Sequence, residues 1–102
     1  MKKITLYIGL NDKDTKTQII PTAEAVSIVT GIIYERTSGA TIYRARGIYT
    51  HDNGEKVTEE TLRVELFGEE PENVKAAAQQ IKTALNQESI AYQEETVNSY
   101  FI

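Results

Sequence analysis

Apolar and polar residues alternate over the first ten positions of the chain. The apolar side chains recur at every second residue, which is the period of a strand with one buried face. They are Ile4, Leu6, Ile8 and Leu10. The polar residues 11–18 that follow predict a loop. We therefore expect a first strand that presents one face to the core.

Two later segments carry apolar residues at the spacing of one helix face. The first stripe consists of Ala25, Ile28, Val29, Ile32 and Ile33, and the second of Val74, Ala77, Ala78, Ile81 and Leu85. Thr22 is the expected N-cap of the first helix, and Gly39 is the expected left-handed residue at its end. Pro71 predicts the start of the second helix. A last strand containing Ile90 and Tyr92 is expected after it.

The segment between the two helices predicts a long hairpin. Asn53-Gly54 is the preferred centre of a two-residue type I′ turn, which requires positive φ at both residues. This turn fixes a register that pairs Tyr43 with Val64 and Arg44 with Arg63. One face of the hairpin is then apolar and the other is largely charged, as expected for a sheet covered on one side only.

The expected order is strand, helix, strand, strand, helix, strand. This order predicts one ferredoxin-like α+β domain over residues 1–102, a split βαβ fold with a four-stranded antiparallel sheet and two helices on one face. A length of 102 residues is typical of a single domain. The other face of the sheet is expected to remain uncovered.

Composition excludes several kinds of site. The chain has no cysteine, so disulfides, thiolate metal sites and thiol catalysis are absent. A net charge of −4 argues against general binding of nucleic acid, whose phosphates favour basic partners. No run of about 18 apolar residues and no signal-peptide pattern occurs, so we expect a cytoplasmic protein without a membrane span.

The predicted uncovered face supplies the candidate binding residues. Its basic and aromatic members are Tyr7, Arg44, Arg46 and Arg63, accompanied by Ile42 and Ile48. Tyrosine and arginine are enriched in protein interfaces, which favours a protein partner. The alternative is that Glu59 and Glu65 neutralise the arginines. The acidic residues Glu59 and Glu60 are candidates for contact with a basic partner surface.

Other chemistry-bearing residues favour structural interpretations. His51 beside Asp52 is expected to be a solvated residue of the hairpin tip. The acidic run at residues 11–15 lacks the glycine and the terminal glutamate of a calcium loop, so we expect no metal. Adjacent carboxylates such as Glu59 and Glu60 point to opposite faces of a strand and do not form a catalytic pair. No cofactor is expected.

Three blocks of the chain resemble a family of small bacterial proteins of unknown function. They are Leu6-Tyr7-Ile8-Gly9-Leu10, Gly47-Ile48-Tyr49 before the turn, and Asn86-Gln87-Glu88-Ser89-Ile90. The resemblance implies the same compact α+β fold and transfers no catalytic residue. In size, charge and composition the chain also resembles accessory proteins of phages and conjugative elements, which include anti-CRISPR proteins.

These observations lead to a non-catalytic protein-binding module as the first hypothesis. Its specific form is a mobile-element inhibitor of a host defence nuclease. The alternative is a sensor domain for a small ligand, with the loop at residues 11–18 beside its cleft. A third hypothesis is an enzyme on a dimeric α+β scaffold that uses tyrosines and His51. A homodimer is expected through the uncovered sheet or through the apolar last residues, Tyr100-Phe101-Ile102. We expect these residues to be docked on their own domain or on a second copy.

Overall fold

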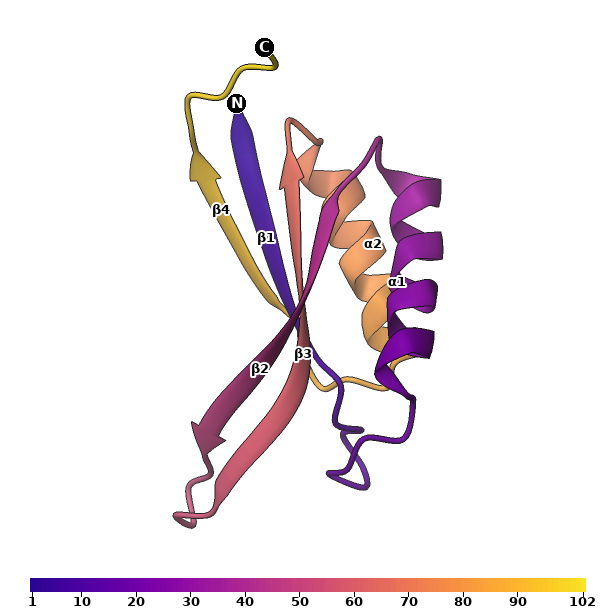
Figure 1. The fold of residues 1–102 in the computed structure, drawn as a ribbon, viewed down its shortest axis with the longest axis vertical. Coiled ribbons are helices and arrows are strands. Elements are labelled where there is room, and N and C mark those ends of the chain that lie inside the picture. The colour runs from indigo at the N-terminus through magenta and orange to yellow at the C-terminus, as the bar shows by residue number, and fades with distance from the viewer.

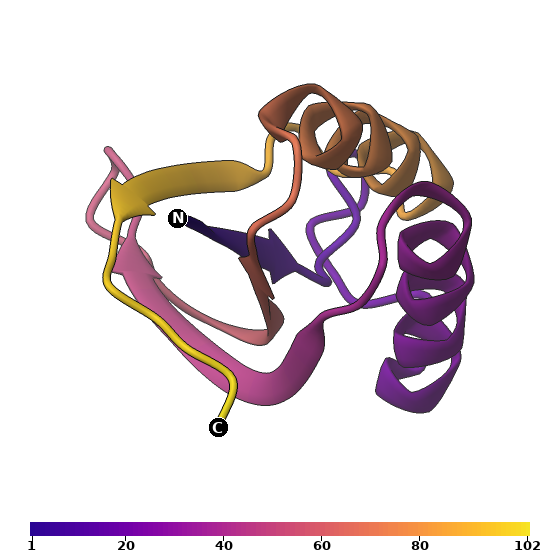
Figure 2. The same ribbon diagram turned by 90° about the horizontal axis from the view of Figure 1, so that it is seen from above.

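The computed structural model describes residues 1–102 as six regular elements. They are β1 (Lys2–Gly9), α1 (Thr22–Arg36), β2 (Thr41–Thr50), β3 (Lys56–Phe67), α2 (Pro71–Ala84) and β4 (Ala91–Thr96). The strands form one antiparallel sheet in the order β2-β3-β1-β4. Both helices lie on the same side of this sheet (Figures 1 and 2). The predicted ferredoxin-like α+β fold is confirmed.

The core lies between the helices and the inner face of the sheet. It contains 15 buried apolar residues from four elements or their ends, namely β1, α1, β3 and α2. Ile4, Leu6 and Ile8 of β1 are fully buried, and so are Leu62 and Val64 of β3. Most of both predicted helix stripes is buried against them, because the 3.6-residue period keeps each stripe on one side of its helix.

The predicted boundaries of α1 need correction. The helix begins at Thr22 as expected, but Pro21 occupies the N-cap position and no side chain caps the first turn. It ends at Arg36, and Thr37 leaves it in an extended conformation. The Thr37 backbone N–H and hydroxyl both donate to the carbonyl of Ile33, each over 2.9 Å. The helix therefore ends before Gly39, which does not have a positive φ.

The hairpin between β2 and β3 has a different turn from the predicted one. Gly54 has a φ of 86°, whereas Asn53 is not left-handed. The His51 N–H donates to the Glu55 carbonyl over 2.8 Å, which closes a three-residue loop at residues 52–54. Asn53 accepts the Glu55 N–H through Oδ1 at 2.9 Å, which stabilises this longer turn. Adding one residue to the loop shifts the register by one residue.

The shifted register exchanges the faces of β2. Tyr43 pairs with Arg63, and Arg44 pairs with Leu62. Because Leu62 points into the core, Arg44 and Arg46 lie on the helix side of the sheet. Tyr43 lies on the uncovered side. The prediction that Arg44 and Arg46 share the uncovered face with Arg63 is therefore wrong, and so is the placement there of Ile42 and Ile48.

The hairpin extends beyond the rest of the sheet. The pairing of β1 with β3 ends where Gly9 meets Thr61, whereas residues 56–60 pair only with β2. This projection gives the molecule extents of 45 × 25 × 22 Å (Figure 1). Tyr100 and Phe101 are 83% and 89% exposed, so the expected docking on their own domain does not occur. Neither helix has the length and apolar composition needed to cross a membrane.

Candidate functional site

One end of the uncovered sheet face is filled by an ionic and aromatic cluster. The guanidinium of Arg63 lies 5.9 Å from the ring centre of Tyr7 and 5.6 Å from that of Tyr43. Its Nη2 is 2.7 Å from Oε2 of Glu65, whose other oxygen accepts the Tyr43 hydroxyl at 2.8 Å. Lys3 Nζ is 3.3 Å from Glu65. The expected neutralisation of Arg63 is thus performed by Glu65.

Glu65 is the buried centre of this cluster. It is only 9% exposed, although it lies on the face that no helix covers. The hydrogen bond from Tyr43 is the largest cause that holds the pKa of Glu65 below its usual value, followed by the bond from Lys3. The same hydrogen bond raises the pKa of Tyr43. These contacts satisfy the Glu65 carboxylate within the chain, whereas Tyr7 remains 40% exposed.

The other end of the uncovered face forms an open cleft of about 920 Å³, which we call the hairpin cleft. Three segments converge there: the projecting hairpin, the loop at residues 11–18 and the loop at residues 86–89. The residues at the bottom, or floor, of the cleft have small side chains, which leaves the space above the sheet open. They are Gly9, Gly47, Thr61 and Ala91.

Glu59 extends across this floor from β3. Its Oε2 accepts the backbone N–H of Asn11 at 2.9 Å, which fixes the carboxylate beside the loop. A β-carbon on Gly9 would come within 2.5 Å of the same oxygen. The position of the carboxylate therefore depends on the absence of a side chain at Gly9. Glu59 is half-buried, and no lysine or arginine forms an ion pair with it.

Aromatic rings form the side of the cleft next to the hairpin. Tyr49 and His51 meet edge to face, with 5.3 Å between their ring centres. Burial is the main cause that raises the pKa of Tyr49, and the charge of Glu59 adds to it. The Tyr49 hydroxyl is therefore protonated at neutral pH. Tyr7 supplies a third ring from β1. The cleft thus combines a carboxylate with aromatic surfaces, which is the environment that attracts organic cations.

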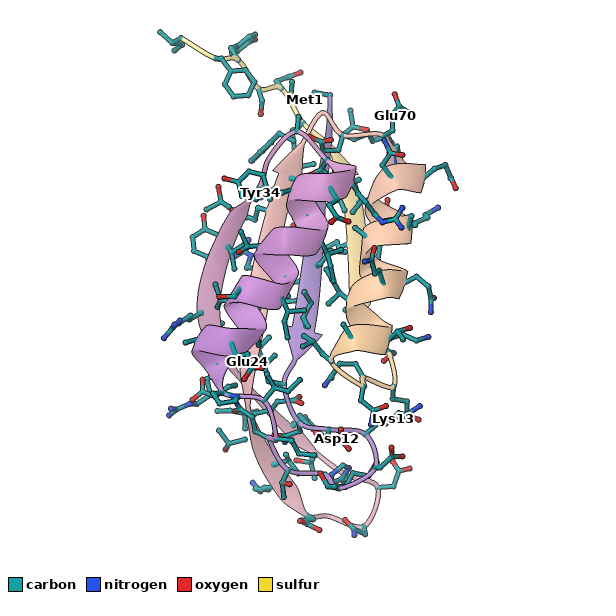
Figure 3. All side chains as sticks on the ribbon, turned by 90° about the vertical axis from the view of Figure 1, so that its right-hand side faces the viewer. Met1, Asp12, Lys13, Glu24, Tyr34 and Glu70 are labelled. Atoms are coloured by element: carbon teal, nitrogen blue, oxygen red, sulfur yellow. The ribbon has the colours of Figure 1, made fainter.

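Two lysines lie on the opposite rim, in the loop at residues 11–18. Lys13 and Lys16 border both the hairpin cleft and an adjoining cavity of about 370 Å³. The loop is held by Asp12, whose Oδ2 accepts the N–H groups of Asp14 and Thr15 at 3.0 and 3.1 Å. Figure 3 shows Asp12 and Lys13 together at the end of the molecule where the hairpin projects.

The loop at residues 86–89 fixes this lysine rim from the other side. Asn86 donates through Nδ2 to Asp12 at 2.8 Å and to Asp14 at 2.9 Å. The first of these bonds is the largest cause that lowers the pKa of Asp12. Gln87 is buried and donates to the carbonyl of Asn11 at 2.8 Å. The two loops therefore act as one ordered unit.

The structure brings together only some of the residues singled out from the sequence. Tyr7 and Glu59 line the cleft, and Arg63 lies beside Tyr7. Glu60 lies on the opposite face and pairs with Arg46 at 3.2 Å. Arg44 is exposed on the helix side.

Sequence reasoning missed other members of the site. His51 is half-buried in the cleft wall, where a solvated turn residue was expected. Gly9 and Gly47 were noted as parts of motifs without a role. Their positions inside strands, where glycine is unfavourable, were the available signal. No group of three or more His, Cys, Asp or Glu side chains is arranged to hold a metal ion.

No protein-family model and no curated protein matches the chain. Solved structures do share its fold. A phage SAM lyase in complex with S-methyl-5′-thioadenosine has a TM-score of 0.68 and 23% identity, covering 92% of this chain and 79% of that chain. The same kind of enzyme in its apo state gives a TM-score of 0.66 at 21% identity, covering 92% and 78%.

A second kind of protein has the same fold. The divalent ion tolerance protein CutA1 from Ehrlichia chaffeensis has a TM-score of 0.60 and 14% identity, covering 97% of this chain and 84% of that chain. At these identities the likeness establishes the fold.

These comparisons correct the functional hypothesis drawn from the sequence. A non-catalytic protein-binding module, with an inhibitor of a host defence nuclease as its specific form, is contradicted because an enzyme shares the fold over 92% of the chain. The prediction that the chain is not an enzyme is wrong for the same reason. The correction extends to the ligand-sensor alternative, since it also assigned no catalysis.

Proposed function

We propose that this chain cleaves S-adenosylmethionine in the hairpin cleft and releases S-methyl-5′-thioadenosine. The observation that carries the proposal is the carboxylate of Glu59, held by Asn11 over Gly9 on the floor of a cleft walled by tyrosine rings. The shared fold with the phage SAM lyase supports it.

The chemistry of the substrate matches these groups. The sulfonium of S-adenosylmethionine is a fixed cation without a hydrogen-bond donor, so a carboxylate and aromatic ring faces are the groups that attract it. Glu59 provides the carboxylate, and Tyr7 and Tyr49 provide the rings. Glu59 forms no ion pair with a lysine or arginine of the chain, which leaves its charge available to a bound cation.

The reaction needs no proton transfer. The bond between sulfur and the γ carbon of the methionine part breaks, and its electron pair remains on sulfur. The γ carbon gains a bond from the carboxylate oxygen of the same molecule, so the other product is homoserine lactone. The cation at sulfur becomes a neutral thioether. Glu59 therefore binds the substrate more tightly than the product, which favours product release.

The test is chromatography with mass detection after incubation with S-adenosylmethionine. We expect S-methyl-5′-thioadenosine and homoserine lactone in equal amounts, formed faster than by the spontaneous decay measured in a blank. Glu59→Gln should lower kcat/KM at least tenfold. Glu60→Gln is the matched control, because this neighbouring carboxylate lies on the opposite face and pairs with Arg46. No product above the blank contradicts the proposal.

We also propose that the chain acts as a homo-oligomer, with its last residues packed on a second copy. The last three residues are apolar or aromatic, and their side chains are exposed to solvent in the single chain. They are Tyr100, Phe101 and Ile102. These three consecutive residues form one contiguous apolar segment, and such exposed segments mark interaction sites.

Sedimentation analysis tests this association. We expect an oligomer at micromolar concentration and dissociation on substitution of Phe101 by serine. Tyr34→Ser is the control, because this exposed tyrosine lies on the outer side of α1. A monomer at all concentrations, or an oligomer unaffected by Phe101→Ser, contradicts the proposed contact.

A further inference from the structure

The lysine rim of the hairpin cleft belongs to the loop at residues 11–18, whose first residue is bound to Glu59. Asn11 donates to Glu59, and Lys13 and Lys16 follow within the same loop. Neither lysine forms an ion pair with a carboxylate of the chain. The cleft therefore has a negative group on its floor and two lysines without an ion pair on its loop side. Lys56 of the hairpin and the carboxylates of Asp12, Glu55 and Glu88 also line it.

The backbone of this loop is held in an uncommon conformation at Lys16. Its φ is 63°, a left-handed value that non-glycine residues rarely adopt. The Lys16 N–H donates to the Asp12 carbonyl over 2.9 Å, and the Asp12 N–H donates to the Thr17 carbonyl over 2.8 Å. Asn86, which is also left-handed with a φ of 49°, anchors Asp12. Such conformations persist where surrounding contacts fix them, and they concentrate at functional sites.

We propose that Lys16, assisted by Lys13, binds the carboxylate of the methionine part of S-adenosylmethionine. This inference rests on the proposed function, because it assigns the remaining charged end of the same substrate. With the sulfonium at Glu59, the amino-acid end extends toward the loop that begins at Asn11. The lysines then distinguish the substrate from S-methyl-5′-thioadenosine, which has lost that carboxylate. They make the cleft selective for ligands that retain the amino-acid end.

Kinetics separate this role from a merely structural one. The carboxylate loses charge as the lactone forms, so the lysines hold the substrate more strongly than the transition state. We expect Lys16→Met to raise the KM for S-adenosylmethionine about fivefold without lowering kcat. The double variant Lys13→Met/Lys16→Met should raise it further and reduce its dependence on salt. Lys75→Met is the control, because Lys75 lies on α2 and pairs with Glu72.

Two inhibitors identify the group that each residue recognises. S-adenosylhomocysteine keeps the carboxylate but has a neutral sulfur, so the lysine variants should weaken its inhibition whereas Glu59→Gln should not. S-methyl-5′-thioadenosine lacks the carboxylate, so its inhibition constant should stay within twofold in the lysine variants. A double lysine variant with an unchanged KM overturns this inference and leaves the proposed function intact. Failure of the wild-type protein to bind or cleave S-adenosylmethionine overturns both.

Discussion

The carboxylate of Glu59 occupies the space that a side chain at Gly9 would need. A β-carbon on Gly9 would lie 2.5 Å from Oε2 and 2.6 Å from both Cδ and Oε1 of Glu59. Gly9 is at the end of β1, opposite Thr61 and next to the start of the loop. A single missing side chain therefore determines where the negative charge of the cleft is held.

Replacing Gly9 by alanine should displace this carboxylate. Because Glu59 is a flexible side chain, we expect it to rotate away from Asn11 and the fold to remain. The kcat/KM for S-adenosylmethionine should fall at least tenfold. Gly31→Ala is the matched control, because a β-carbon there meets no atom within 4 Å. That change, in the interior of α1, should stabilise the protein by about 0.5–1 kcal/mol. Unchanged activity in Gly9→Ala would show that the carboxylate position is unimportant.

Removing the Tyr43 hydroxyl should destabilise the protein in a pH-dependent way. The pKa of Glu65 is lowered in the folded state, so its contribution to stability is present above the unfolded value of 4.5 and is lost as the pH falls through the folded value. Tyr43→Phe removes the largest cause of this shift. We expect the free energy of unfolding to fall at pH 7, because Glu65 then lacks its main hydrogen-bond donor.

Urea unfolding at a series of pH values measures this effect. The difference in unfolding free energy between wild type and Tyr43→Phe should shrink toward zero below the folded pKa of Glu65. At such pH values the Glu65 carboxyl is protonated in both proteins. Tyr34→Phe should show no difference, since Tyr34 is 76% exposed. An equal loss at acidic and neutral pH would indicate lost packing in place of the charged hydrogen bond.

Tyr92 should make the folded state sensitive to alkali. Burial, followed by the hydrogen bond to Glu94 at 2.6 Å, raises the pKa of Tyr92 from 10.0 to about 12. The folded state thus favours the protonated phenol, so its contribution is complete below pH 10 and is lost as the pH rises to about 12. Tyr92→Phe should reduce this alkaline loss by about 1–2 kcal/mol. Unfolding free energies between pH 9 and about pH 12 would measure it, and identical curves for the two proteins would contradict it.

The hairpin turn should depend on Gly54. Its φ of 86° is unfavourable for any residue with a β-carbon, although no atom lies within 4 Å of the position. The cost of Gly54→Ala therefore comes from the backbone alone, and we expect a loss of about 1 kcal/mol in the free energy of unfolding. Gly39→Ala offers the comparison, since Gly39 is equally open and has no positive φ. Equal stabilities of the two variants would show that the turn tolerates a side chain.

The sequence alone was sufficient for the elements and for the inward faces of most of them. Val29 and Ile33 of α1 and Leu62 and Val64 of β3 are buried as their spacing predicts. Such patterns extend over several turns or strand positions, so an error at one residue does not alter the prediction. The fold class followed because two apolar helix faces and four strands have few simple ways to bury their apolar sides.

The candidate site was predictable only in part. The sequence indicates Glu59 and Tyr7 as candidate binding residues. It does not indicate that they line the same cleft. The register of β2 depended on the backbone conformation of one residue, Asn53, which local preference did not determine. A shift of one position moved Tyr43 to the uncovered face and Arg44 to the helix side.

The sequence by itself determined which residues form the core and which elements they build, because periodicity is a local property repeated along the chain. Only the tertiary structure decided the hairpin cleft. The loops that contain Asp12 and Asn86 are separated by 74 positions, and they meet because β1 lies next to β4 in the sheet and α2 returns the chain to the end where β1 finishes. Contacts of this kind depend on how the elements pack, which no local pattern specifies.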